Sequence, residues 1–404
     1  MYILKPFVYD KFQCIGKDCP YTCCGGWVIM IDEDTYKRYG QYEKNTKRRI
    51  EENTTYNEEG NFHTFKLNEK GVCPFCDEEQ LCMLIKEKGE EALCLTCETY
   101  PREQFLTVVM EERYLSLSCP AVVAFLRDLK EPLSFVLEED GRAIDDGLGE
   151  NVREEERKEI EDLYSAIRLD MQIRDRILNF LQDRKWPLWF REYFVSYCLQ
   201  RIEEAHQQKK ENEVHALLEK MIHPLFLERT MEALGSIHKE EEKQFYQLQQ
   251  IAVEFQEKIL SVTYYDKGRS RVEASKLFDK NASIDYGEYK EQMAEWAAEE
   301  KENFDILMEQ VIAYQWMRYA MEGWTSSYMV DNYWEIICEQ LLIKYFCILY
   351  YAIHRKINWE NYEFIIALVI RALSHGRDAL KIILENLKEK EILSVANLFW
   401  LIQS

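Results

Sequence analysis

Cysteine is the residue type best able to support chemistry in this chain, and its distribution is uneven. A chain of 404 residues buries enough core to fold without disulfides, so cysteines concentrated in one segment indicate metal or redox chemistry. Cys338 and Cys347 stand in an apolar helical stretch and are expected to be core residues. Of the thirteen cysteines, ten precede residue 120: Cys14, Cys19, Cys23, Cys24, Cys73, Cys76, Cys82, Cys94, Cys97 and Cys119.

Spacing alone suggests a structural zinc site. Cys73-x2-Cys76 and Cys94-x2-Cys97 form two short turns, and each turn can supply two thiolates to a tetrahedral zinc ion. This interpretation leaves six cysteines of the same segment without a role: Cys14, Cys19, Cys23, Cys24, Cys82 and Cys119.

An iron–sulfur cluster is the competing interpretation, because its four thiolates can come from separate parts of a chain. Cys23 and Cys24 are adjacent, and neighbouring side chains generally diverge. Both can bind one compact centre only with an unusual backbone, which Gly25-Gly26 permits. Alternatively, the two sulfurs face different centres, or one is a free nucleophile. The usual radical S-adenosylmethionine triplet C-x3-C-x2-C does not occur.

The cysteine pattern resembles that of the flagellin lysine-N-methylase family over about residues 1–125. The later part of the chain resembles the family in length and helical character, with Arg371-x3-His375 as a local echo. The motifs that carry the resemblance are Cys14-x4-Cys19-x3-Cys23-Cys24-Gly25-Gly26-Trp27, Cys73-Pro74-Phe75, Cys82, Cys97-x2-Tyr100-Pro101-Arg102 and Leu117-Ser118-Cys119-Pro120.

The resemblance implies an enzyme that transfers methyl groups from S-adenosylmethionine to flagellin lysines, with a 4Fe-4S cluster, or Zn²⁺ as the alternative metal. It does not require Cys76 or Cys94, which the paired zinc motif needs. We prefer the resemblance because it accounts for eight cysteines in order, although Cys76 and Cys94 could still join a site. The metal ligands that it implies are Cys14, Cys19, Cys23, Cys24, Cys73, Cys82, Cys97 and Cys119.

Three residues are candidates for catalytic roles. Arg102 could pair with a carboxylate of cofactor or substrate, or anchor the cysteine loop. Arg371 and His375 lie one helical turn apart, where structural hydrogen bonding is the competing role. Gly147-Leu148-Gly149 lacks a preceding strand, so a doubly wound cofactor-binding sheet is not expected. The cofactor pocket is therefore expected at the cluster or among the helices.

The elements that must position these residues fall into two regions. Residues 1–125 mix element types, including a hairpin in which Phe105–Met110 and Arg113–Ser118 are the strands. Residues 126–151 are expected to be a linker and 152–404 an all-α domain with stripes of apolar residues three and four apart. The predicted fold is mainly α, with a small cysteine-rich α+β metal-binding region followed by a large all-helical domain.

Charge and hydropathy restrict the partners. With 51 Lys+Arg and 73 Asp+Glu, the formal charge of −22 disfavours nucleic acid. The longest apolar run, 345–353, is short of the roughly 20 residues that span a bilayer. No signal peptide is visible, so a cytoplasmic location without a membrane span is expected. A protein-lysine N-methyltransferase acting on flagellin is the leading hypothesis. The alternative is a non-enzymatic Fe–S or structural zinc protein whose helical domain docks a partner.

Overall fold

The computed structural model describes most of the chain. The described residues are 2–19, 22–25, 27–58, 60–69, 71–106, 110–141, 154–236, 241–258, 284–319, 326–375, 377–390, 397 and 401–402, with some side chains near the ends of these ranges left out. The expected glycine cluster at 147–149 lies outside them.

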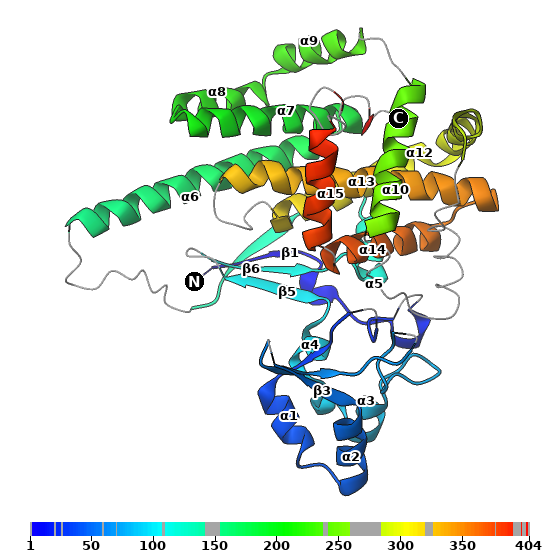
Figure 1. Ribbon diagram of the computed structural model, residues 1–404. Coiled ribbons are helices and arrows are strands. Elements are labelled where there is room, and N and C mark those ends of the chain that lie inside the picture. Colours follow the sequence, from blue (N-terminus) through cyan, green and yellow to red (C-terminus); the bar gives the residue numbers. More distant parts are fainter. Residues whose placement is uncertain are drawn as a thin grey trace.

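A small lobe hangs below the rest of the molecule in Figure 1, and we call its residues 22–100 the cysteine lobe. Its sheet has the order β2-β4-β3 and is antiparallel. Ten buried side chains, Phe65 and Phe75 among them, form its core. Its elements are β2 (Met30–Ile31), α1 (Glu33–Tyr39), α2 (Lys44–Glu52), β3 (Thr54–Asn57), β4 (Phe62–Phe65), α3 (Met83–Lys88), a 3-10 turn (Glu90–Ala92) and α4 (Leu95–Thr99).

A second sheet, ordered β5-β6-β1-β7, belongs to the larger part of the molecule, which we call the helical body. Its apolar residues share one core with the helices, as Tyr114 and Leu115 do. The strands β5 and β6 form the expected hairpin, although 107–109 lie outside the described residues. The sheet and the elements beside it are β1 (Tyr2–Pro6), two 3-10 turns (Tyr9–Lys11 and Gly16–Asp18), β5 (Arg102–Leu106), β6 (Met110–Leu115), α5 (Pro120–Asp128) and β7 (Phe135–Glu139).

The expected linker, 126–151, is partly structured. The strand β7 lies within it and pairs antiparallel with β1, placing Leu137 opposite Leu4. The apolar stretch Phe135-Val136-Leu137 gives this short segment strand character. The part from 142 to 151 lies outside the described residues.

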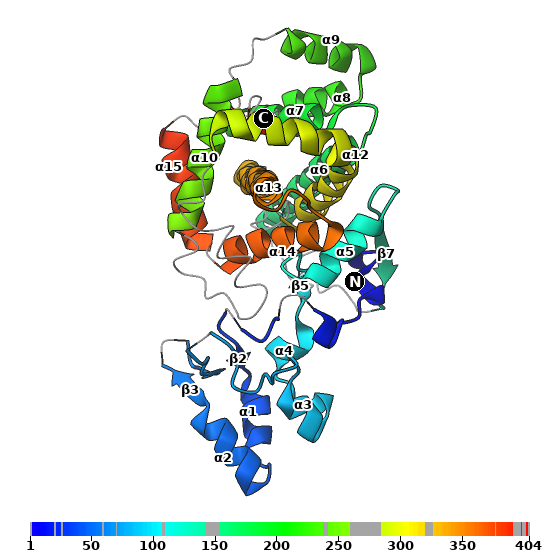
Figure 2. The ribbon, with the colours of Figure 1, turned by 90° about the vertical axis from the view of Figure 1, so that its right-hand side faces the viewer.

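From residue 154 onward, the described part of the chain is almost entirely helical, which confirms the predicted fold class. In Figure 2, α13 runs through the middle of the helical body, and it packs against α7, α10, α12, α14 and α15. The helices are α6 (Glu154–Leu181), α7 (Leu188–Gln207), α8 (Glu211–Lys220), α9 (Pro224–Gly235), α10 (Glu241–Lys258), α12 (Tyr286–Tyr319), α13 (Ser326–His354), α14 (Trp359–His375) and α15 (Arg377–Glu389).

The segment Met329–His354 of α13 is long and apolar enough to cross a membrane by length and composition alone. However, 83% of its most apolar window is buried inside the molecule. A helix at the centre of a core needs the same apolar composition on all its faces. The apolar character of α13 is therefore accounted for by packing.

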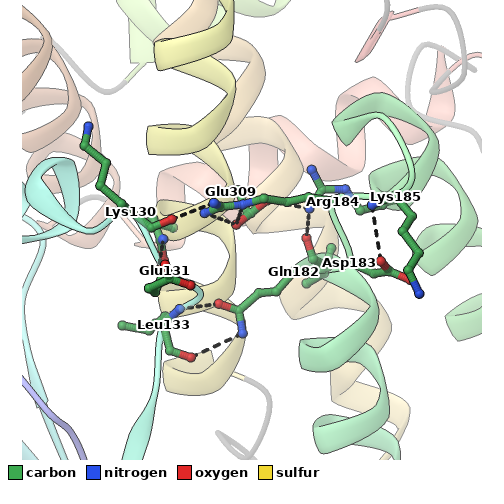
Figure 3. Close-up of polar contacts among 11 residues, drawn as sticks. Lys130, Glu131, Leu133, Gln182, Asp183, Arg184, Lys185 and Glu309 are labelled. Carbon is green, nitrogen blue, oxygen red and sulfur yellow. Dashed lines mark hydrogen bonds and ion pairs between the residues drawn. The ribbon is translucent and has the colours of Figure 1, made fainter.

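A buried carboxylate ties the helices to the loop that precedes β7. Glu309 on α12 is 1% exposed and accepts hydrogen bonds from Arg184 Nε at 3.0 Å and Arg191 Nη1 at 2.7 Å. Figure 3 shows Arg184 reaching across to the Lys130 carbonyl, a contact of 2.6 Å. The Glu309 carboxylate is thus the shared hydrogen-bond acceptor of two arginines.

Replacing Glu309 with leucine is expected to lower the free energy of unfolding by about 3–5 kcal/mol, because it leaves the buried Arg191 guanidinium without its carboxylate and also removes the partner of the more exposed Arg184. Glu302→Leu, at an exposed position of the same helix, is the control. Urea unfolding followed by tryptophan fluorescence measures the difference. A loss below 1 kcal/mol would show that the pair contributes little.

Burial raises the pKa of the Glu192 carboxyl on α7 to about 8, and the charges of Lys344 and Arg191 offset only part of this rise. The folded chain then holds a proton that the unfolded chain releases near its ordinary pKa of about 4.3. The stabilising contribution is full below that value and is lost as the pH rises to about 8. Glu192→Gln should therefore gain several degrees of Tm over the parent protein between pH 5 and 8.5, whereas the exposed Glu219→Gln should not. An equal pH dependence in the parent and Glu192→Gln would contradict this assignment.

Candidate metal and cofactor site

A cavity of about 770 Å³ lies where the cysteine lobe meets the helical body. The helical body contributes Phe12 and the start of α5, and the cysteine lobe contributes most of the other walls. All ten cysteines of the first 120 residues line it. The structure therefore brings together the eight cysteines implied by the resemblance and adds Cys76 and Cys94.

Of the seven cysteines in the cysteine lobe, all but Cys23 pack with its core. The backbone joins their loops, since Cys73 N–H donates to the Cys24 carbonyl at 2.7 Å, and Cys76 lies opposite Cys82 in a β-bridge. All six lie in the core of the lobe or pack against it. We call them the lobe-side set: Cys24, Cys73, Cys76, Cys82, Cys94 and Cys97.

The opposite wall belongs to the helical body. Cys119 is the N-cap of α5 and is part of the core of the body, and Cys19 packs against that core. Burial raises the pKa of the Cys119 thiol to about 11. Cys14 is exposed, and its sulfur accepts the Gly16 N–H at 3.4 Å.

Contacts among the thiols favour negative charge at particular sulfurs. Hydrogen bonds with Cys23 and Cys76 lower the pKa of Cys24, and a hydrogen bond with Cys97 lowers the pKa of Cys94. Burial raises the pKa of Cys73 to about 12. Because the thiolate is the form that binds metal, a bound metal would deprotonate the remaining thiols.

Among the described residues, no three His, Cys, Asp or Glu side chains are arranged as ligands of one metal ion. In a four-iron cluster each thiolate binds its own iron, so the sulfurs surround a volume instead of meeting at a point. The cavity has ten cysteines among the residues of its walls. The four cysteines of the paired zinc motif all belong to the lobe-side set, so the arrangement also keeps those thiols together.

The structure gives both candidate arginines contacts with the backbone. Arg102 donates from Nη2 to the Phe12 carbonyl at 3.3 Å, and its guanidinium carbon lies 5.2 Å from the centre of the Phe12 ring. Arg371 is 4% exposed and donates from Nη1 to the Thr22 carbonyl at 3.0 Å. Its Nη2 donates to the Gly25 carbonyl. Both therefore hold the chain that carries the cysteines. The His375 side chain lies outside the described part of the chain.

Sequence reasoning assigned no role to the aromatic side chains of the cavity. Trp27 lies with its ring centre 5.5 Å from that of Tyr100, and its Nε1 donates to the Cys23 carbonyl at 2.8 Å. Both rings line the cavity. Their positions directly after the Cys-Cys-Gly-Gly run and before Pro101-Arg102 were the available signal.

Comparisons with known proteins find lysine N-methylases and a flagellar protein. Residues 174–401 match the model of the FliB lysine N-methylase C-terminal domain. Over 141 residues, 34% of this chain, the sequence is 32% identical to a lysine-N-methylase of Salmonella typhimurium and covers 35% of that protein. It is 33% identical, also over 141 residues, to the flagellar biosynthetic protein FliU of Salmonella muenchen and covers 82% of it. The match thus spans about a third of the lysine-N-methylase. No solved structure matches the chain.

Proposed function

Because the chain belongs to the FliB lysine N-methylase family, we propose that it is a protein-lysine N-methyltransferase that uses S-adenosylmethionine, acts on flagellin and holds a 4Fe-4S cluster. The observation that carries the cofactor part is the single cavity lined by ten cysteines. The printed names of the relatives, lysine-N-methylase and flagellar biosynthetic protein, support the reaction and the substrate.

The walls of the cavity suit methyl transfer to an amine. The reaction needs a neutral lysine nitrogen aligned with the sulfonium methyl. Aromatic side chains such as Phe12, Trp27 and Tyr100 exclude water, which disfavours the charged form of a lysine. Aromatic faces also attract the positive sulfonium of the cofactor. When bound, an iron cluster with an open ligand position would supply a binding site for the amino and carboxylate groups of the cofactor.

The test uses the full chain purified without oxygen, loaded with iron and sulfide, and incubated with methyl-labelled S-adenosylmethionine and flagellin. Label on flagellin lysines is expected. Metal-loaded protein that leaves flagellin unlabelled would overturn the proposed reaction and favour a non-enzymatic metal protein. Zinc without acid-labile sulfide in protein from anaerobic cells would overturn the cluster.

Serine substitutions separate the two ligand interpretations. Cys73→Ser and Cys97→Ser are expected to lose bound iron, since a serine oxygen is a poorer ligand for iron than a thiolate. Cys76→Ser and Cys94→Ser should keep most of it, because the resemblance does not require these thiols. Iron analysis of the four anaerobically purified variants gives the answer. Loss at 76 and 94 would instead show that the four cysteines of the paired motif hold the metal.

A further inference from the structure

We propose that Trp27 and Tyr100 form the recognition site for a cation that carries methyl groups, either the sulfonium of the cofactor or a methylated lysine. This inference rests on the proposed function and deepens it, because it names the side chains that recognise the positive charge. It concerns the binding of the cation and not the transfer step.

The degree of burial distinguishes these two rings from the other aromatic side chains of the cavity. The Phe12 ring packs against the Arg102 guanidinium, whose carbon lies 5.2 Å from the ring centre. Trp27 and Tyr100 are half-buried, so part of each side chain remains accessible at the wall of the cavity. The other described aromatic residues that line the cavity are buried: Phe12, Tyr39, Phe65 and Phe75.

Hydrogen bonds fix the two rings to different parts of the molecule. Trp27 Nε1 donates to the Cys23 carbonyl at 2.8 Å, which ties the indole to the cysteine lobe. The Tyr100 hydroxyl lies 3.0 Å from the Ser118 hydroxyl, which lies 2.8 Å from that of Ser116. Both serines are buried and precede α5 of the helical body. With ring centres 5.5 Å apart and planes inclined at 44°, the rings form a preorganised surface.

The chemistry of this surface suits a cation with methyl groups. The face of an aromatic ring attracts a cation within about 6 Å of the ring centre, and most strongly at Trp. A neutral ligand of the same shape keeps the apolar contacts but loses this attraction. The two rings therefore predict a preference for the charged ligand over its neutral counterpart, whereas a purely structural role predicts no contribution to that preference.

The test measures this preference by equilibrium dialysis on the full chain, loaded with iron and sulfide without oxygen. One arm compares S-adenosylmethionine with the neutral S-adenosylhomocysteine, and the other compares trimethyllysine amide with acetyllysine amide, so the arms separate cofactor from lysine. The parent chain should prefer the charged ligand in at least one arm. Trp27→Leu and Tyr100→Leu should each reduce that preference about tenfold, and Trp27→Phe, which keeps a ring, about threefold. Tyr197→Leu, at an exposed position of α7, should leave it unchanged.

The ratio of the two affinities decides the outcome, because lost packing would weaken charged and neutral ligands alike. A parent chain without a preference in either arm overturns the proposal, as does a parental ratio in both leucine variants. Iron analysis and circular dichroism check each variant, and where a leucine variant loses iron or unfolds, a parental ratio in Trp27→Phe overturns the proposal in its place. A parent chain that shows the preference but leaves flagellin unlabelled would refute the proposed reaction and leave the cation site standing.

Discussion

Replacing Arg371 with leucine is expected to remove most of the bound iron, although no atom of Arg371 need touch a metal. Its guanidinium links α14 of the helical body to the Thr22 and Gly25 carbonyls on either side of Cys23-Cys24. Figure 1 shows α14 at the end of the helical body that faces the cysteine lobe. The variant would lose two charged hydrogen bonds, each worth about 1.5–3 kcal/mol, and leave buried carbonyls without a donor.

The expected loss has a graded control. Arg371→Lys keeps the charge but cannot reach both carbonyls with a planar fork, so it should retain an intermediate amount of iron. Arg229→Leu, at an exposed position of α9, should retain all of it. Iron and sulfide analysis together with proteolysis near residues 22–25 measures the effect. Full iron content and unchanged protection in Arg371→Leu would show that the loop is held by other contacts.

The sequence was most informative where structure is local. The helical stripes after residue 152 and the hairpin of β5 and β6 follow from periodicity and short loops, and the structure has both. The gathering of the cysteines was predicted from their residue type and from the family resemblance. The helices and the hairpin could be predicted from residues that are close together along the chain. The gathering of the cysteines could be predicted because all of them can bind metal.

Long-range pairings were not predictable in this way. The strand β1 lies between β6 and β7, so the first residues of the chain complete a sheet whose other strands begin about 100 residues later. The apolar stretch at 135–137 is compatible with a strand, but its partner β1 lies at the start of the chain, so the local pattern alone did not reveal the pairing in the segment that we expected to be a linker. The contact between Arg371 and Thr22 joins residues 349 positions apart. Arg371 itself was a candidate because of the resemblance, but its partners depend on the packing of α14.

Removal of metal from the full chain is expected to unfold the cysteine lobe and to leave the helical body intact. The lobe core consists of ten buried side chains, and two of them, Cys73 and Cys94, are cysteines of the cavity. A unit of about 80 residues with so small a core is marginally stable without a metal or disulfides. When ligand residues form part of the core, the free energy of metal binding becomes free energy of folding. The helical body has its own much larger core around α13, in which Cys119 is the one buried cysteine of the cavity.

Limited proteolysis and hydrogen exchange of the anaerobic protein, before and after chelation, test this expectation. Fast cleavage and loss of amide protection should appear in α1, α2 and the sheet β2-β4-β3, while α7, α12 and α13 keep their protection. The thiols should be kept reduced, because new disulfides would restrain the lobe after the metal is lost. Unchanged protection throughout the lobe would mean that its ten-residue core is sufficient and that the cysteines serve chemistry without supporting the fold. Loss of protection in both parts would instead show that the lobe and the body unfold as one unit, with the contacts of Arg371 as the first candidates for the coupling.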